Sequence, residues 1–247
     1  EVIVFDDVTT LIQAQRDAAW GEVARRLAHE IRNPLTPIQL SAERLQHKVG
    51  TRLGGDEAAL LQRSTETIIH QVEAMKEMVQ AFSEYARPPA LRPQAVDLNA
   101  LVREVVELYQ GEPEQPAFRL DLDEDLPWLQ ADPGRLRQLL NNLLRNALEA
   151  GEAGHCRVVV ATRQGSGRYA DMIELDVQDN GPGFAESMLN QLFEPYVSTK
   201  PRGSGLGLAI VKKIVEEHNG MIGARNVDGG ARISVRLPRV MPGDARQ

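Results

Sequence analysis

The first third of the chain carries apolar residues at steps of three and four, a spacing that fits one face of a long α-helix. One series runs from about Ala14 to Val49 and a second from Leu61 to Phe82, with a Gly- and Asp-containing break at 50–56. The series comprise Trp20, Ala24, Leu27, Ile31, Leu35, Ile38, Ala42, Leu45 and Val49, then Leu61, Thr65, Ile68, Val72, Met75, Val79 and Phe82. This pattern predicts an antiparallel helical hairpin. Because two helices cannot enclose a core by themselves, we expect a homodimer in which two hairpins form a four-helix bundle.

A Pro-rich segment then separates two architectures. The run Arg-Pro-Pro-Ala-Leu-Arg-Pro at 87–93 cannot continue a helix or a strand ladder, because proline lacks the backbone N–H. Beyond it helical patterns alternate with β-branched runs, which predicts an α/β sandwich. The expected helices cover 99–110, 133–150 and 204–219, and the expected strands cover 118–122, 157–162, 172–177, 221–225 and 231–237. An Asp132 cap, an Asn219-Gly220 helix end and a Gly229-Gly230 hairpin turn complete the pattern.

These patterns give the expected domain boundaries. Residues 14–87 form the hairpin, 88–94 the linker, 95–240 the α/β domain and 241–247 a tail. The strand-like start EVIVF, without a Met, suggests a fragment of a longer protein in which residues 1–13 end an upstream domain.

Composition limits the partners. The 247 residues include 28 basic and 35 acidic side chains, a formal charge of -7, with no dense Lys/Arg cluster, so neither nucleic acid nor an anionic membrane is expected as a partner. The single Cys156 excludes an intrachain disulfide, and no apolar run reaches the roughly 18 residues of a membrane span. We therefore expect a soluble, cytoplasmic fragment, whose full-length protein could still be anchored in a bacterial inner membrane.

His29 lies off the apolar face of the first predicted helix. Glu30 adjoins it, Asn33 lies one turn further on, and Pro34 and Pro37 interrupt the helical hydrogen bonding nearby. An exposed imidazole is a competent nucleophile, and a neighbouring carboxylate can accept its proton, so this cluster suits phosphoryl-acceptor chemistry. Asn33 could hold a water in line with a phosphorus on His29 for the reverse, hydrolytic step. The alternatives are a solvated surface histidine and a metal site, for which the three or four ligands of a zinc site are missing.

Three segments of the second half suggest a nucleotide pocket. Asn142 and Asn146 share one helix face, and Asp179 ends a predicted strand before two glycines. A glycine-rich run at 203–208 then opens a helix, whose free backbone amides favour an anion. Each segment alone is weak, but together and in this order they indicate nucleotide binding. The spacing fits neither the dinucleotide fingerprint nor the Walker loop, so another nucleotide fold is required.

The sequence resembles the two-component sensor histidine kinases. Residues 26–37, RLAHEIRNPLTP, resemble their phosphoacceptor box, and 139–150, 179–183, 193–196 and 203–208 resemble their N, G1, F and G2 boxes. The segment FEPYVSTK, which starts at Phe193, is similar to the corresponding segment of the NtrY-type nitrogen-regulation sensors.

The resemblance implies a role for each matching residue. His29 would be phosphorylated, Glu30 would be its base, and Asn33 would position water when the enzyme dephosphorylates its partner. The second domain would be an ATP-binding domain of the Bergerat (GHKL) type. The residues implied to hold ATP and Mg²⁺ are Asn146 on the metal, Asn142 near the phosphates, Asp179 on the adenine amine, Gly181 and Gly183 beside the base, and Gly203, Gly205 and Gly207 in the lid.

The resemblance also implies partners. The phosphoryl acceptor would be an aspartate of a response-regulator receiver domain, of NtrX-like type for an NtrY-like sensor. Asp7-Val8-Thr9 resembles the exit of a PAS sensor domain.

One position departs from the family pattern. Many members carry a basic residue where this chain has Glu149, so Lys200 or Arg202 is expected to supply that charge to the phosphates.

Two alternative functions stay open. One is a GHKL-type ATPase, in which a water-activating glutamate would stand at the position that Asn142 occupies here. The other is a catalytically silent dimeric scaffold.

Overall fold

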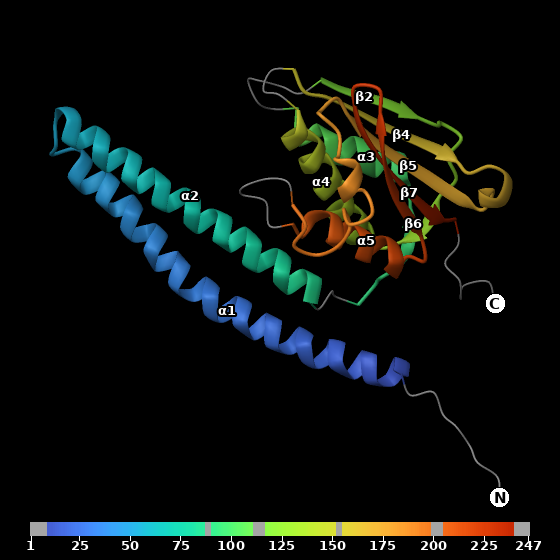
Figure 1. Ribbon diagram of the computed structural model, residues 1–247, viewed down its shortest axis with the longest axis horizontal. Helices are drawn as coiled ribbons and strands as arrows, with labels where there is room; N and C mark the ends of the chain where they lie inside the picture. Colours follow the sequence, from blue (N-terminus) through green and yellow to red (C-terminus); the bar gives the residue numbers. More distant parts are fainter. Residues whose placement is uncertain (1–8, 87–89, 111–116, 152–154, 199–204, 240–247) are drawn as a thin grey trace, which may run out of the picture. The chain divides into compact units, whose positions relative to one another are not determined.

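The computed structural model describes residues 9–86, 90–110, 117–151, 155–198 and 205–239 (Figure 1). Within these ranges, the side chains of residues 9–26, 29, 77, 81 and 84–86 are outside what is described. The chain divides into two compact units, residues 1–89 and 90–247. None of the helices in the described part of the chain is long and apolar enough to cross a membrane.

The first unit is an antiparallel pair of long helices (Figure 1). Helix α1 spans Thr9–Gly50 and helix α2 spans Gly55–Ala86, joined by a short turn that ends at Gly55 with a φ of 59°. The predicted hairpin is therefore confirmed. The strand-like start EVIVF lies within residues 1–8, which are outside the described part, and α1 already includes residues 9–13, which were expected to end an upstream domain.

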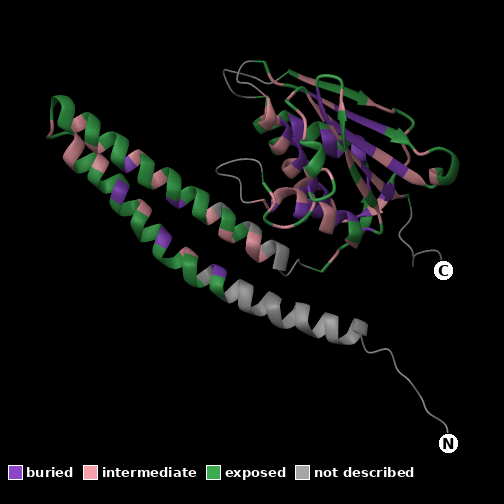
Figure 2. Ribbon diagram, in the orientation of Figure 1, coloured by how far each residue is buried: buried purple, intermediate pink, exposed green. Residues whose placement is uncertain are grey.

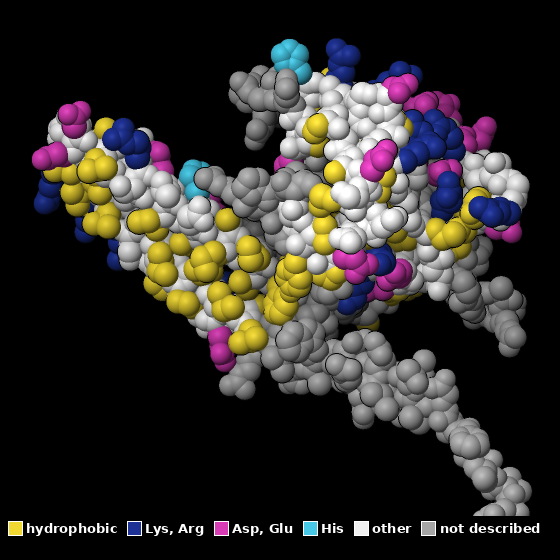
Figure 3. All heavy atoms as spheres, viewed as in Figure 1, with side chains coloured by type: hydrophobic (Ala, Val, Ile, Leu, Met, Phe, Trp, Pro, Cys, Tyr) yellow, Lys and Arg dark blue, Asp and Glu magenta, His cyan; other side chains and the backbone are white. Residues whose placement is uncertain are grey.

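The apolar series of α1 divides into two adjacent stripes. Ala28, Leu35 and Ala42 of α1 and Thr65 and Val72 of α2 are buried in the hairpin, in which the two helices pack together. The neighbouring apolar side chains remain 41% to 60% exposed, namely Leu27, Ile31, Ile38 and Leu45 of α1 and Leu60, Ile68, Met75 and Met78 of α2. Apolar side chains run along the visible face of the hairpin in Figure 3. One hairpin thus buries only part of the apolar surface that the sequence pattern provides.

Polar side chains fix the register of the two helices. Arg32 donates to the side-chain oxygen of Gln80, and Lys76 Nζ donates to Gln39 Oε1 at 2.6 Å. Both pairs join residues on opposite helices, so a slip of either helix by one turn would break both bonds. The hairpin therefore combines buried apolar residues with specific polar pairs nearer its surface.

The second unit is a two-layer α/β sandwich. Its five-stranded sheet has the order β2-β4-β5-β7-β6, in which only β2 and β4 run parallel. The strands are β2 Ala117–Leu122, β4 Arg157–Gln164, β5 Met172–Asp179, β6 Met221–Val227 and β7 Gly230–Pro238. Helices α3 Leu98–Glu107, α4 Pro133–Ala150 and α5 Gly207–Glu217 cover one face of this sheet (Figure 1). Two short 3-10 turns, Gly167–Tyr169 and Glu186–Met188, lie in the connections.

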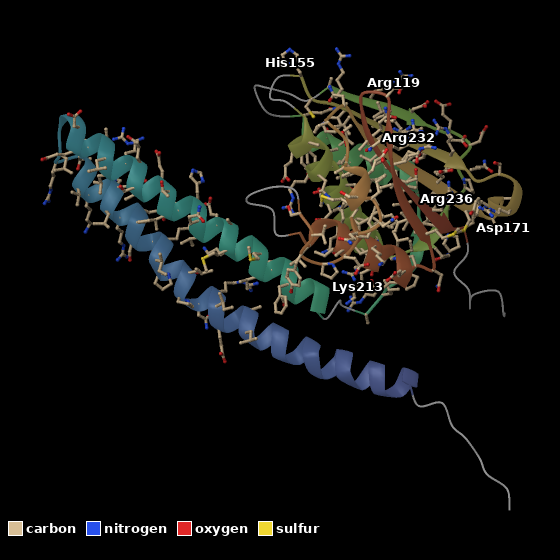
Figure 4. All side chains as sticks on the ribbon, in the orientation of Figure 1. Arg119, His155, Asp171, Lys213, Arg232 and Arg236 are labelled. Carbon is tan, nitrogen blue, oxygen red and sulfur yellow. The ribbon has the colours of Figure 1, made fainter. Side chains whose placement is uncertain are left out.

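The two faces of the sheet differ in chemistry. Ile173, Leu175 and Val177 of β5 are buried beneath the helices, and Figure 2 shows buried residues both on strands of the sheet and on the helices that cover it. The alternate residues carry charge: Arg236 donates to Glu174 at 2.8 Å, and Arg163 contacts Asp176 at 3.4 Å. Arg119, Arg232 and Arg236 are labelled in Figure 4 on strands of this sheet. Strict alternation along β5 thus separates an apolar core from a charged outer face.

Some boundaries differ from the sequence expectations. A further two-stranded ladder pairs β1, Gln94–Val96, with β3, Leu129–Ala131, so the expected linker overlaps the start of β1. Helix α5 begins at Gly207, three residues after the expected start. Gly230 belongs to β7 and pairs with Val227, which leaves Asp228 and Gly229 as the turn. Three-residue strands are too short to show a period in the sequence, which explains why β1 and β3 were missed.

The start of α4 is tied to its surroundings by Asp132. As predicted, Asp132 caps the helix: Oδ1 accepts from the backbone amides of Gly134 at 2.9 Å and Arg135 at 3.1 Å, while Oδ2 accepts from the Arg92 amide at 2.9 Å. Burial acts to raise the pKa of the Asp132 carboxyl, but these backbone hydrogen bonds outweigh it and lower the pKa below its ordinary value. The fully buried His218 accepts from the Asp132 backbone amide at 3.1 Å through Nε2. The carboxylate form of Asp132 therefore joins α4 to the chain entering this unit.

We predict that Asp132→Ala lowers the free energy of unfolding by about 1–2 kcal/mol at pH 7, because it removes an N-cap. A lowered pKa in the folded state means that the charged form stabilises the fold above pH ~4 and that this stabilisation is lost as the pH falls through the folded pKa. Urea unfolding followed by circular dichroism at pH 7 and pH 3 measures both effects. The control is Asp171→Ala, at an exposed residue (Figure 4). An equal penalty at both pH values would contradict the carboxylate cap.

Candidate nucleotide and phosphoacceptor sites

Two asparagines of α4 form one wall of the candidate pocket. The Asn142 side-chain amide donates to the Gln138 carbonyl at 3.0 Å, which leaves its oxygen available. Asn146 Nδ2 is buried and has no hydrogen-bond partner among the described residues. Since buried polar atoms are nearly always paired in folded proteins, this orphaned amide indicates a position where a polar ligand belongs.

The start of α5 lies directly against these asparagines. A Cβ added to Gly207 would stand 3.5 Å from Asn142 Oδ1 and 3.6 Å from Asn146 Nδ2. Leu206, the N-cap residue of α5, has an apolar side chain that does not cap the backbone amides of the first turn. Free amides and the positive end of the helix dipole attract anions, and amide oxygens are suitable ligands for Mg²⁺. This corner of the unit therefore fits phosphate groups with a divalent cation.

Asp179, the next expected binding residue, lies at the end of β5. Its Oδ1 accepts from the backbone amides of Gly181 at 2.8 Å and Ala231 at 3.3 Å. Its Oδ2 has no hydrogen bond to another described residue. One oxygen is thus fixed by the protein, and the other can accept a hydrogen bond from an exocyclic amine of a base.

The glycines of the pocket are explained by contacts within the protein. A Cβ on Gly181 would stand 2.6 Å from the Ala150 carbonyl oxygen, and a Cβ on Gly205 would stand 2.5 Å from the Tyr196 carbonyl carbon. Gly183 has a φ of 76°, which favours glycine, and its Cβ would stand 2.8 Å from a side-chain oxygen of Asn226. From the sequence, we expect Gly181 and Gly183 to let the backbone approach a planar base. The structure adds another reason, because close packing of the loop against its own protein already requires glycine at both positions.

Two asparagines that are not among the expected site residues hold the loop at 180–184. Asn180 Oδ1 accepts from the Arg157 amide at 2.7 Å, and Asn180 Nδ2 donates to the His155 carbonyl at 2.9 Å. Asn226, on β6, makes two hydrogen bonds to the backbone of Phe184. Asparagine is depleted in strands, so its presence within β6 was the available signal in the sequence.

Cys156 lies close enough to Asp179 for the charge of that carboxylate to affect its thiol. Burial, and next the negative charge of Asp179, raise the pKa of the Cys156 thiol, while a hydrogen bond with the Gly151 backbone lowers it less. The thiol therefore stays protonated at neutral pH and is a poor nucleophile.

The phosphoacceptor cluster lies on α1, where His29 has helical backbone and a side chain outside the described part. Ala28 is buried against α2, whereas the side chains of Glu30 and Asn33 are exposed. The helix continues through Pro34 and Pro37, which have no N–H to donate to the carbonyls of Glu30 and Asn33. The expected lid residues Lys200, Arg202 and Gly203 lie outside the described residues. In the described part of the chain, no group of His, Cys, Asp and Glu side chains could hold a metal ion by itself.

Two family models match the two units. Residues 19–91 match the His Kinase A (phospho-acceptor) domain, and residues 131–241 match the histidine kinase-, DNA gyrase B- and HSP90-like ATPase domain. This chain is a sensor histidine kinase core that resembles the NtrY type. The order of the two domains and the ATP-binding fold agree with the resemblance noted in the sequence.

Known proteins extend this result. The chain is 41% identical to the nitrogen regulation protein NtrY of Azorhizobium caulinodans over 99% of its own length and 32% of that protein. It is 35% identical to the sensor histidine kinase ZraS of Escherichia coli K12, covering 89% of this chain and 46% of that one. The chain thus spans about a third to a half of the length of these curated relatives.

Solved structures agree with the fold of the histidine kinase core. Full-length ShkA in complex with AMPPNP gives a TM-score of 0.71 at 26% identity, covering 90% of this chain and 46% of that one. Histidine kinase ThkA in complex with the response regulator protein TrrA gives 0.66 at 28% identity, covering 95% and 68%.

We predict that Gly181→Ala weakens ATP binding about tenfold and lowers the stability of the protein by about 1–3 kcal/mol, because the added methyl group cannot fit beside Ala150. The matched control is Gly223→Ala in β6, where a Cβ would meet no atom within 4 Å. Calorimetric titration with ATP and thermal unfolding measure the two effects. Equal behaviour of the two variants would show that the Gly181–Ala150 contact is not required.

Proposed function

We propose that this core uses ATP to phosphorylate His29 and then transfers the phosphoryl group to an aspartate of a response-regulator receiver domain. The observation that carries the proposal is the pocket in which Asn142, Asn146 and the uncapped start of α5 meet, with an orphaned amide among them. A pocket for phosphates and metal, in the same chain as a histidine beside Glu30 and Asn33, suits phosphoryl transfer.

In the proposed reaction a ring nitrogen of His29 attacks the γ-phosphorus. The P–N bond forms as the bond to the bridging oxygen breaks, and ADP leaves with that electron pair. Glu30 accepts the proton from the other ring nitrogen, which keeps the product neutral at the ring. In the second step the P–N bond breaks, a carboxylate oxygen of the receiver aspartate bonds to phosphorus, and the ring recovers its proton. We further propose that Asn33 orients a water for hydrolysis of the aspartyl phosphate, which would make the enzyme bifunctional.

The pocket residues have separate proposed tasks. Asn146 would hold Mg²⁺, which neutralises charge on the phosphates, and Asn142 would contact the phosphates. Asp179 would accept from the adenine amine through its free oxygen. Lys200, or Arg202 beside it, would bring a positive charge to the phosphates in place of the acidic Glu149.

The proposed surroundings follow the NtrY resemblance. The regulator would be NtrX-like, and residues 1–13 would connect the core to a PAS-like sensor domain of a protein anchored in the inner membrane. The relatives are longer than this chain, which leaves room for such domains.

A GHKL-type ATPase is less well supported. At the position where such an enzyme would need a water-activating glutamate, the amide of Asn142 donates to a helix carbonyl and cannot act as a base. This chemistry favours an enzyme that holds ATP until a histidine arrives.

We expect the protein to become labelled when incubated with γ-labelled ATP and Mg²⁺. The label should survive alkali and be lost in acid, as for a phosphoramidate, and it should be absent from His29→Gln. The matched control is His70→Gln, at an exposed histidine of α2, which should be labelled like the wild type. Persistent label in His29→Gln would place the phosphate elsewhere, and no label in the wild type would favour the silent scaffold.

We also propose that two hairpins pair as a homodimer through their exposed apolar stripes. The stripe of α1 includes Leu27, Ile31, Ile38 and Leu45, which remain 41% to 49% exposed in one hairpin. Such a continuous apolar stripe at heptad-like spacing is typical of a helix that packs against a partner. A second copy would complete the core of a four-helix bundle.

We predict that Ile38→Glu shifts the protein from dimer to monomer at micromolar concentration, because a buried carboxylate without a partner opposes association. The matched control is Thr36→Glu, an exposed position on the opposite side of the same helix. Sedimentation velocity measures the result. A wild-type monomer, or a dimeric Ile38→Glu variant, would refute pairing through this stripe.

A further inference from the structure

Asn226 clamps the nucleotide loop from the edge of the sheet. Its Oδ1 accepts from the Phe184 backbone amide at 2.8 Å, and its Nδ2 donates to the Phe184 carbonyl at 2.8 Å. The side chain thus satisfies both backbone groups of one loop residue, as a neighbouring strand would. Asn226 is exposed and lies on β6, which forms one edge of the sheet.

The loop is shaped to accept this clamp. Gly183, directly before Phe184, has a φ of 76°, and a Cβ there would stand 2.8 Å from Asn226 Oδ1. Only glycine leaves the asparagine side chain room to reach the next backbone amide. The second glycine of the Asp179–Gly183 segment is therefore explained by Asn226.

The same hairpin holds the other end of the loop. Ala231, on β7, donates its backbone amide to Asp179 Oδ1, and Ala231 is the register partner of Asn226. One ladder position of the β6–β7 hairpin thus anchors both Asp179 and Phe184. The hairpin fixes the start of the loop by a backbone amide and its end by a side chain.

We infer that Asn226 is a positioning residue for the nucleotide: by fixing the loop at Phe184 it holds the Asp179 carboxylate in the orientation that presents Oδ2 to the adenine amine. This role rests on the proposed ATP-dependent function. Asn226 acts through the loop and does not itself touch the reacting atoms. Asn226 therefore affects the affinity for the nucleotide and not the rate of the phosphoryl-transfer step that follows binding.

The test uses the whole chain with Asn226→Ala and Asn226→Asp. Losing two exposed hydrogen bonds should raise the KM for ATP and the Kd for ADP about tenfold while kcat for autophosphorylation stays within about twofold. Asn226→Asp should bind at least as weakly, because its second oxygen faces the Phe184 carbonyl oxygen. The matched control is Arg225→Ala, the exposed neighbour on β6, which should bind like the wild type.

A second measurement separates positioning from loss of structure. Hydrogen exchange of the Phe184 amide should speed up in Asn226→Ala without nucleotide, while the thermal midpoint changes little. Unchanged KM and Kd in both variants, with an active wild type, would overturn the inference and leave the proposed function intact. An equal loss in Arg225→Ala would also overturn it, because the effect would then belong to β6 in general. A wild type that binds neither ATP nor ADP would overturn both proposals.

Discussion

Packing of α4 against the sheet determines the rest of the nucleotide unit. Leu136, Leu139, Leu140, Leu143 and Leu144 are at most 1% exposed, and burial of each leucine contributes roughly 1.5–3 kcal/mol relative to an exposed one. Because the helix repeats every 3.6 residues, fixing the leucine face also fixes the adjoining face, where Asn142 and Asn146 lie three residues after Leu139 and Leu143. The pocket wall is therefore a consequence of the core. The position of these amides depends on packing energy that is present without any ligand.

The helical unit shows the opposite situation, in which packing within one chain is incomplete. The buried positions are small or isolated, as at Ala28, Ala42 and Val72, and larger side chains such as Ile38 remain exposed. Polar pairs such as Gln39 with Lys76 specify the register of this hairpin, but the hairpin buries little apolar surface. Its stability and its association with a partner are thus expected to be coupled.

Sequence patterns predicted the elements that repeat over several turns or strand residues. Periodicity and cap residues predict the helix that carries Asn142 and the strand that ends at Asp179. The resemblance supplies the residues that are proposed for the pocket. The ladder of β1 with β3 was missed, because three residues show no period. Contacts between distant segments were also out of reach: nothing local to Gly183 shows that a side chain from β6 occupies the space a Cβ would fill. The sequence thus singles out Gly183, and the structure adds a packing reason that the sequence alone does not show.

Asp179 shows why such distant contacts matter for recognition. A carboxylate with two free oxygens rotates and can present either of them, whereas hydrogen bonds from Gly181 and Ala231 occupy Oδ1 and leave a single acceptor with a fixed direction. Orienting the carboxylate before the ligand arrives lowers the entropy that binding must overcome. The groups that provide this orientation lie on β7 and in the loop, so the selectivity of the pocket depends on the sheet as much as on the motif. A loop shaped in this way needs glycine where strands approach it closely, which accounts for the glycine-rich sequence without reference to the ligand.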